Sequence, residues 1–145
     1  GRACFTENSV EEIDEALLRV IDVAADGAPE AVAAAAARAA MRRGSPTMLK
    51  VTLERLRRAQ GEKSLRESLG VDFRVVMNCV ARGETGDFVR GVRAKLVEKK
   101  AVESWNPPTL QEVTEDDVAA FFEPVDGVRD LELEEDGGVA VSAKM

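Results

Sequence analysis

Basic side chains crowd the stretch DFVRGVRAKLVEKK, from Asp87 to Lys100, although the whole chain carries a net charge of −7. A tryptophan and a proline pair, Trp105, Pro107 and Pro108, follow it directly. Clustered Lys and Arg side chains attract polyanions such as a phosphorylated cofactor or RNA. The same pattern is typical of a solvated basic face that acidic segments of the same chain neutralise. Both interpretations remain open from charge alone.

The distribution of charge along the chain fits either interpretation. Residues 42–100 carry fifteen Lys and Arg against seven Asp and Glu, whereas residues 101–145 carry two against twelve. Residues 1–41 are also acidic, with three basic and eight acidic side chains. The basic middle therefore lies between two segments that could neutralise it, or it offers its surface to an anionic partner.

Residues suited to catalysis are scarce. The chain has no His and no sequence typical of a catalytic serine, a phosphate-binding loop or a dinucleotide fold. Adjacent carboxylates such as Glu11 and Glu12, or Asp116 and Asp117, point about 100° apart on a helix, so capping explains them better than catalysis. Cys79 lies beside an apolar stripe, which favours packing over nucleophilic chemistry. We expect no catalytic residue and no metal site in this sequence.

The composition indicates one soluble, globular unit. The chain has 145 residues, of which 45% are hydrophobic and 32% charged. Two cysteines, Cys4 and Cys79, are too few for a disulfide framework and indicate free thiols. No apolar run approaches the roughly 20 residues of a membrane-spanning helix. The sequence begins with Gly1, so we expect a processed chain or a piece of a longer one.

Helix-start signals predict five to six helices in the first 122 residues. Ser9, Ser45, Ser64 and Thr114 each stand where an N-cap is expected. Two more helices are predicted, the second over about Pro29–Arg43 and the fifth in the basic stretch that begins at Asp87. Three of these helices carry apolar stripes: Leu49, Leu53 and Leu56; Leu65, Leu69, Phe73, Val76 and Val80; Phe88, Val92 and Leu96. Such stripes outnumber the faces that could cover them, so the isolated chain is expected to self-associate.

The pattern changes after Pro124. The sequence LELEEDGGVAV alternates apolar and acidic residues around Asp136-Gly137-Gly138, which predicts either a short β-hairpin or an acidic tail. We therefore divide the chain into a helical region, 1–124, and a tail or hairpin, 125–145.

Four motifs follow one another at close spacing: SPTMLKVTLERLRR, VDFRVVMNC, DFVRGVRAKLVEKK and SWNPPTLQEVTEDDVAAFF, beginning at Ser45, Val71, Asp87 and Ser104. With CFTENSVEEI at Cys4, they resemble the C-terminal part of the 3-hydroxyisobutyryl-CoA hydrolases, a branch of the enoyl-CoA hydratase/isomerase (crotonase) superfamily. The resemblance covers roughly residues 3–124 of this chain, but only the last third of a family member. It implies a mainly α fold, the helical C-terminal part of a crotonase-like protein.

The resemblance also implies a chemistry: hydrolysis of an acyl-CoA thioester in valine breakdown, in mitochondria. CoA would be part of the substrate, with no separate cofactor. An oxyanion hole of two backbone N–H groups and an acidic catalytic residue would lie upstream of this sequence. The parent protein would then be a thioester hydrolase, whereas this chain alone is not expected to be an enzyme.

Site residues are implied in the same way, because late helices in such relatives pack near the CoA nucleotide or against neighbouring subunits. On that basis Lys95, Lys99 and Lys100 are candidate contacts for the CoA phosphates. Trp105 is a candidate wall for adenine, or an anchor for the following loop. Without any ligand, lysines in the last turn of a helix still gain about 0.3–1 kcal/mol each from the helix dipole.

Two alternatives belong to other functional classes. One is a non-catalytic interaction module, like a mitochondrial ribosomal protein that resembles this family. In that case RNA phosphates would contact the basic fifth helix and an arginine-rich run: Arg42, Arg43, Arg55, Arg57 and Arg58. The other is a helical module whose exposed apolar faces await a missing core. The expected partners are thus the rest of a crotonase core or neighbouring subunits and an acyl-CoA, with RNA only under the first alternative and no membrane.

Overall fold

The computed structural model describes residues 3–131, and within that range the regular structure is helical, with no strand. The six α-helices are α1 Val10–Val23, α2 Pro29–Arg43, α3 Pro46–Ala59, α4 Leu65–Ala81, α5 Asp87–Val92 and α6 Glu115–Ala119. Single helical turns occur at Ala3–Thr6, Gly83–Thr85, Arg93–Val97, Leu110–Glu112 and Ala120–Phe122. The predicted mainly α architecture is confirmed. The hairpin turn predicted at Asp136-Gly137-Gly138 lies outside the described residues.

The predicted helix starts are confirmed at the level of single hydrogen bonds. The hydroxyls of Ser9, Ser45, Ser64 and Thr114 each accept a hydrogen bond from the backbone N–H three residues later. Each such cap stabilises its helix by about 1 kcal/mol. These caps set where α1, α3, α4 and α6 begin, and so fix the orientation with which each connection enters its helix.

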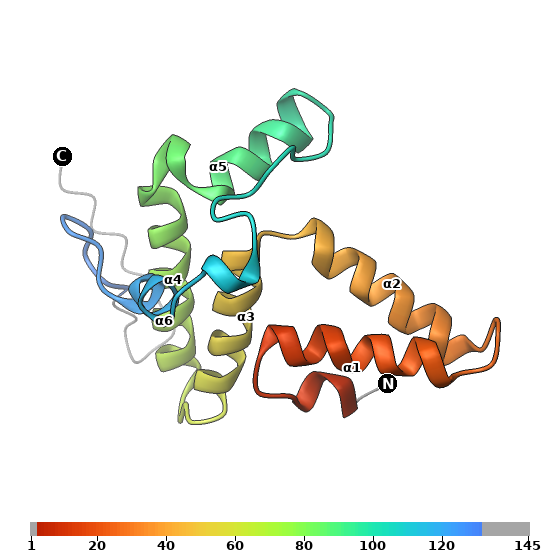
Figure 1. The fold of residues 1–145 in the computed structure, drawn as a ribbon. Coiled ribbons are helices and arrows are strands. Elements are labelled where there is room, and N and C mark those ends of the chain that lie inside the picture. The colour runs from red at the N-terminus through yellow and green to blue at the C-terminus, as the bar shows by residue number, and fades with distance from the viewer. Residues whose placement is uncertain (1–2, 132–145) are drawn as a thin grey trace.

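The helices pack in two groups (Figure 1). α1 and α2 form an antiparallel arm around a small cluster of buried residues: Cys4, Ile13, Ala16, Leu17 and Ala34. α3, α4 and α6 enclose a second cluster: Val51, Cys79, Val113, Val118, Phe121 and Phe122. The bidentate pair of Arg38 with Asp14, at 2.8 and 3.0 Å, holds the arm together across its two helices. No helix of the described part has both the length and the apolar character needed to cross a membrane.

The apolar stripe of α4 lies on the outside. Leu65 is 74% exposed, Val76 57% and Val80 48%. The opposite side of the helix is packed instead, through Cys79 and the partly buried Val71 and Val75. The Asn78 carboxamide fixes this choice, because it donates to the carbonyls of Phe121 and Glu123 at 3.1 and 2.9 Å. The helix thus has two apolar faces, of which the longer one is uncovered in this chain.

Candidate functional site

The basic helix is shorter than its sequence suggests. α5 ends at Val92 and widens into one π-helical turn, Arg93–Val97, with the Glu98 N–H bonded to the Arg93 carbonyl at 2.9 Å. Lys99 then adopts φ 52°, in the left-handed region, and the Lys100 N–H bonds to the Ala94 carbonyl at 2.9 Å. This is a C-terminal cap in which glycine is the usual residue. Lys99 therefore terminates the helix as well as carrying a charge.

The three candidate lysines differ in what surrounds them. Lys95 is exposed and forms no ion pair or hydrogen bond with any residue in 3–131. The Lys100 ammonium lies 2.7 Å from a Glu103 carboxylate oxygen and 3.2 Å from one of Glu98. Hydrogen bonds to Glu103 and then Glu98 raise the pKa of Lys100, and Lys100 lowers the pKa of Glu103. Much of the charge of Lys100 is thus balanced locally, whereas that of Lys95 is not.

Trp105 anchors the loop that follows. Its indole N–H donates to the Arg43 carbonyl at 3.1 Å, which ties the loop to the end of α2. Its ring packs on α5 at Gly91, where a Cβ atom would lie only 3.3 Å from the Trp105 Cη2 atom. The absence of a side chain at Gly91 therefore permits this close approach. Trp105 meets α5 one turn before Lys95, while Lys99 and Lys100 lie beyond the end of the helix.

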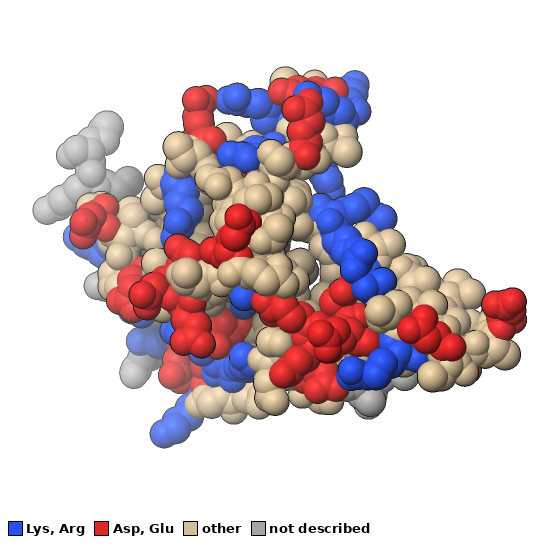
Figure 2. Space-filling model, viewed as in Figure 1, with Lys and Arg blue, Asp and Glu red and all other residues tan. Residues whose placement is uncertain are grey.

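Two arginines that were not proposed from the sequence as CoA contacts lie beside Trp105. The Arg90 guanidinium donates to the Ser104 carbonyl at 3.0 Å, directly before Trp105. Arg43, whose carbonyl accepts from the indole, has an exposed side chain without an ion pair in the described region. Figure 2 shows basic side chains gathered over α5 and beside the C-terminal end of α2. Their separation of about fifty residues in the sequence hides this proximity.

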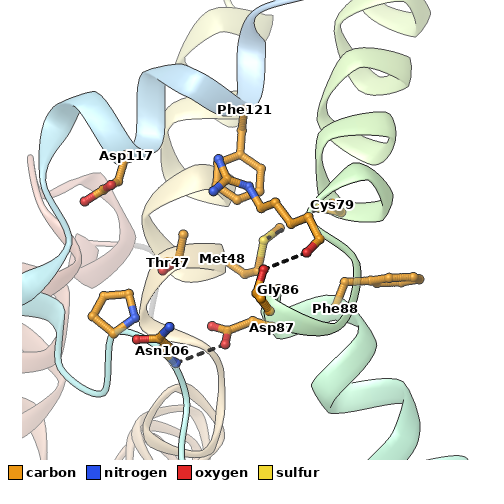
Figure 3. Close-up of a pocket in the computed structure, with 12 residues that line it drawn as sticks. Thr47, Met48, Cys79, Gly86, Asp87, Phe88, Asn106, Asp117 and Phe121 are labelled. Carbon is orange, nitrogen blue, oxygen red and sulfur yellow. Dashed lines mark hydrogen bonds between the residues drawn. The ribbon is translucent and has the colours of Figure 1, made fainter. Parts of the chain in front are cut away.

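A cavity of about 270 Å³ lies where the starts of α3 and α5 meet the end of α4, the proline loop and α6 (Figure 3). Asp87 connects these parts, since its carboxylate accepts hydrogen bonds from the Ser45 hydroxyl and from the Asn106 N–H. The cavity is lined on its polar side by Thr47, Asp87, Asn106 and Asp117. Asp87 thus links the start of α3 to the proline loop, a role that neither charge nor helical periodicity in the sequence indicated.

The thiol of Cys79, which also lines this cavity, lies in a buried environment that disfavours the thiolate. Cys79 is buried, and its Sγ atom lies 3.8 Å from the Met48 Sδ atom. Burial raises the pKa of the Cys79 thiol, and the Arg82 charge offsets only part of that effect. The packing role expected for Cys79 agrees with this environment. In residues 3–131 no three Cys, Asp or Glu side chains are arranged to hold a metal ion.

Comparisons with known proteins match this architecture to one family. The family model for enoyl-CoA hydratase/isomerase matches residues 2–122. The mitochondrial 3-hydroxyisobutyryl-CoA hydrolases of Rattus norvegicus and Homo sapiens are 35% and 37% identical over 131 residues, which is 90% of this chain and 30% of each relative. The Arabidopsis thaliana small ribosomal subunit protein mS47 is 33% identical over 94 residues, covering 65% of this chain and 23% of that protein. The resemblance inferred from the motifs is confirmed.

A solved structure is similar in fold. The crystal structure of a carnitinyl-CoA dehydratase from Mycobacterium thermoresistibile matches with a TM-score of 0.69 and 38% sequence identity, over 86% of this chain and 32% of that one. The chain therefore spans about a third of the length of the solved structure and of the hydrolases that it matches. It corresponds to part of a crotonase-type protein.

Proposed function

Because the chain belongs to the enoyl-CoA hydratase/isomerase family, we propose that it is the C-terminal helical portion of a 3-hydroxyisobutyryl-CoA hydrolase-like enzyme. The observation that carries the proposal is the identity of 35% to the rat hydrolase over 90% of this chain but 30% of that protein. The catalytic carboxylate and the oxyanion hole would lie in a part of the enzyme outside this sequence. The mitochondrial location is proposed with it from the names of the relatives, and the place in valine breakdown from the family resemblance.

Under this proposal, α5 and the loop after it supply cations for the phosphates of CoA. Lys95 is the first choice, because its ammonium is exposed and unpaired among the described residues. Lys99 is exposed too, whereas Lys100 is already paired with two glutamates. Trp105 positions the loop through Arg43 and Gly91, and the exposed part of its ring is the surface on which adenine could stack.

The uncovered apolar faces have a role in the same proposal. The stripe of α4 and the exposed Val92 and Leu96 at α5 would pack against the rest of the enzyme or a neighbouring subunit. The relatives are about three times as long as this chain, and the part of them outside the match would provide the surface that covers these faces. The helical portion would therefore depend on that partner for part of its stability.

Substitution of Lys95 by Ala in the complete enzyme tests the CoA contact. We expect KM for the acyl-CoA to rise about 3- to 10-fold with little change in kcat, because a phosphate contact far from the thioester stabilises substrate and transition state alike. Lys63→Ala is the matched control, since Lys63 is an exposed lysine outside this surface. An unchanged KM for Lys95→Ala would remove Lys95 from the site, and absence of hydrolysis by the unmodified enzyme would overturn the proposed function.

The similarity to mS47 supports a second candidate, a ribosome-associated module. The contacts of the arginine-rich run weaken it. Arg42 pairs with Asp14 at 3.2 Å, and Arg55 pairs with Glu62 at 2.8 Å and also binds Asp72. Arg57 donates to the Asn8 carbonyl, and Arg58 pairs with Glu54 at 2.8 Å. Four of the five arginines proposed for RNA thus already have partners within the chain, which favours the enzyme.

A further inference from the structure

Among residues 3–131, one buried hydroxyl lacks a hydrogen-bond partner. This hydroxyl belongs to Thr47, which lies in the first turn of α3 and is 8% exposed. Its Oγ1 atom is buried and forms no hydrogen bond with any described residue. It lines the cavity bounded by α3, α4, α5 and α6 (Figure 3). A buried hydroxyl left unpaired lowers stability, so a water molecule or a polar ligand group that bonds to Thr47 would be favoured in this cavity.

The charged groups of the same cavity indicate the sign of that group. Asp87 accepts hydrogen bonds from neutral donors, the Ser45 hydroxyl and the Asn106 N–H. Asp117 likewise accepts from the Thr114 hydroxyl and N–H, at 2.7 and 2.9 Å. Neither carboxylate has an ion-pair partner within residues 3–131. Two negative charges thus face one small space without a cation bonded to either.

Arg82 is the cationic residue that lines the cavity, and it stacks on an aromatic ring instead of pairing with Asp87 or Asp117. Its guanidinium lies 4.0 Å over the centroid of the Phe121 ring. Its charge contributes to lowering the pKa of Asp117, but less than the hydrogen bonds from Thr114 do. The cavity lining therefore keeps a net negative charge, with Met48, Phe88 and Phe121 as its apolar wall.

From this arrangement we propose that the cavity binds the end of an alkylammonium or alkylguanidinium group. The Thr47 hydroxyl accepts one N–H, the Asp87 and Asp117 carboxylates accept the others, and the alkyl stem lies on Met48 and Phe121. The volume, about 270 Å³, is near the lower end for ligand sites and suits one such group rather than a whole cofactor. This site is separate from the CoA contact proposed at Lys95.

Two sources can supply such a cation: a free small amine, or a Lys or Arg side chain of another polypeptide segment. Titrating the 145-residue chain with n-butylammonium and with Nα-acetyl-lysine methylamide, followed by ¹H–¹⁵N NMR, distinguishes them. If both compounds give saturable chemical-shift changes at the Thr47 and Asn106 amides, the natural ligand of the cavity is assigned as a protein side chain. Saturation with n-butylammonium alone assigns a free amine. n-Butanol and butyrate are the neutral and anionic controls.

The test variants are Thr47→Val, which keeps the shape but removes the hydroxyl, and Asp117→Asn, which keeps the cap on α6 but removes the charge. Each should weaken cation binding roughly tenfold, the loss expected for one hydrogen bond to a charged group. Thr52→Val is the matched control, because Thr52 is an exposed threonine on the same helix. The proposal is overturned if neither cation saturates, if butanol or butyrate binds as well, or if both variants bind the cation like the unmodified chain.

Discussion

Lys99 ends its helix in a backbone conformation that favours glycine, and it also carries a charge proposed to contact CoA. Its φ of 52° places it in the left-handed region, which costs a non-glycine residue about 1–2 kcal/mol. Glycine is the usual residue at such a helix end because it has no Cβ atom. The side chain of Lys99 is exposed, so its ammonium is accessible for the contact proposed with CoA.

Lys99→Gly is therefore expected to raise the free energy of unfolding by about 1 kcal/mol. Lys95→Gly is the control, because Lys95 lies within the helical turn Arg93–Val97, where glycine should lower the free energy of unfolding by about 1 kcal/mol. Urea unfolding of the two variants and the unmodified chain measures both changes. Equal or lower stability of Lys99→Gly would contradict the strain assigned to Lys99.

At the scale of elements, a charged contact adds to the small core that holds α1 and α2 together. α2 is rich in alanine and buries only Ala34 fully, so little apolar surface holds it to α1. Asp14 receives hydrogen bonds from Arg38 and Arg42. Burial acts to raise the pKa of Asp14, but the bonds from Arg38 and Arg42 outweigh it, and the pKa is lowered below 3.8.

Since the folded state lowers this pKa, the contribution of Asp14 to stability is present above its unfolded pKa and is lost as the pH falls through the folded one. Asp14→Asn should lower the free energy of unfolding by about 1–2 kcal/mol near pH 7 and by clearly less near pH 2.5. Asp22→Asn is the control, because Asp22 is exposed on the same helix and unpaired within residues 3–131. Urea unfolding at both pH values tests this, and a pH-independent loss would refute the ionic role.

The sequence predicts those elements best whose causes are local. The caps at Ser9, Ser45 and Ser64 depend on residues three positions apart, and the structure confirms them. The packed side of α4 could not be predicted in the same way. Two apolar faces compete on that helix, and the tertiary bonds of Asn78 decide between them.

The site shows the same limit. Clustered lysines are visible in the sequence, but the left-handed Lys99 and the pairing of Lys100 with Glu103 are not. The cavity was missed altogether, because Thr47, Asp87 and Asp117 come from segments that only the fold brings together. The contact of Gly91 with Trp105 is likewise visible only in the structure, because the two residues are fourteen positions apart in the sequence.

At the scale of the whole molecule, the uncovered stripe of α4 determines how the isolated chain behaves. Leu69, Phe73, Val76 and Val80 recur at the spacing of a helix–helix seam, and three of the four are exposed. A continuous apolar strip of this kind is unfavourable in water and is normally covered. In the complete enzyme the proposed cover is the remainder of the protein, so a chain that lacks it should cover the stripe with a second copy.

We expect the 145-residue chain to self-associate, and Leu69→Lys combined with Val76→Glu to make it monomeric without changing its net charge. The pair of substitutions places two charges within the seam, where burying them would cost several kcal/mol. Val23→Lys is the matched control, because Val23 is an 85% exposed valine at the end of α1, away from the stripe, and its variant should associate like the unmodified chain. Sedimentation equilibrium distinguishes these states. A strictly monomeric unmodified chain, or association that survives the double substitution, would show that the α4 stripe does not drive self-association.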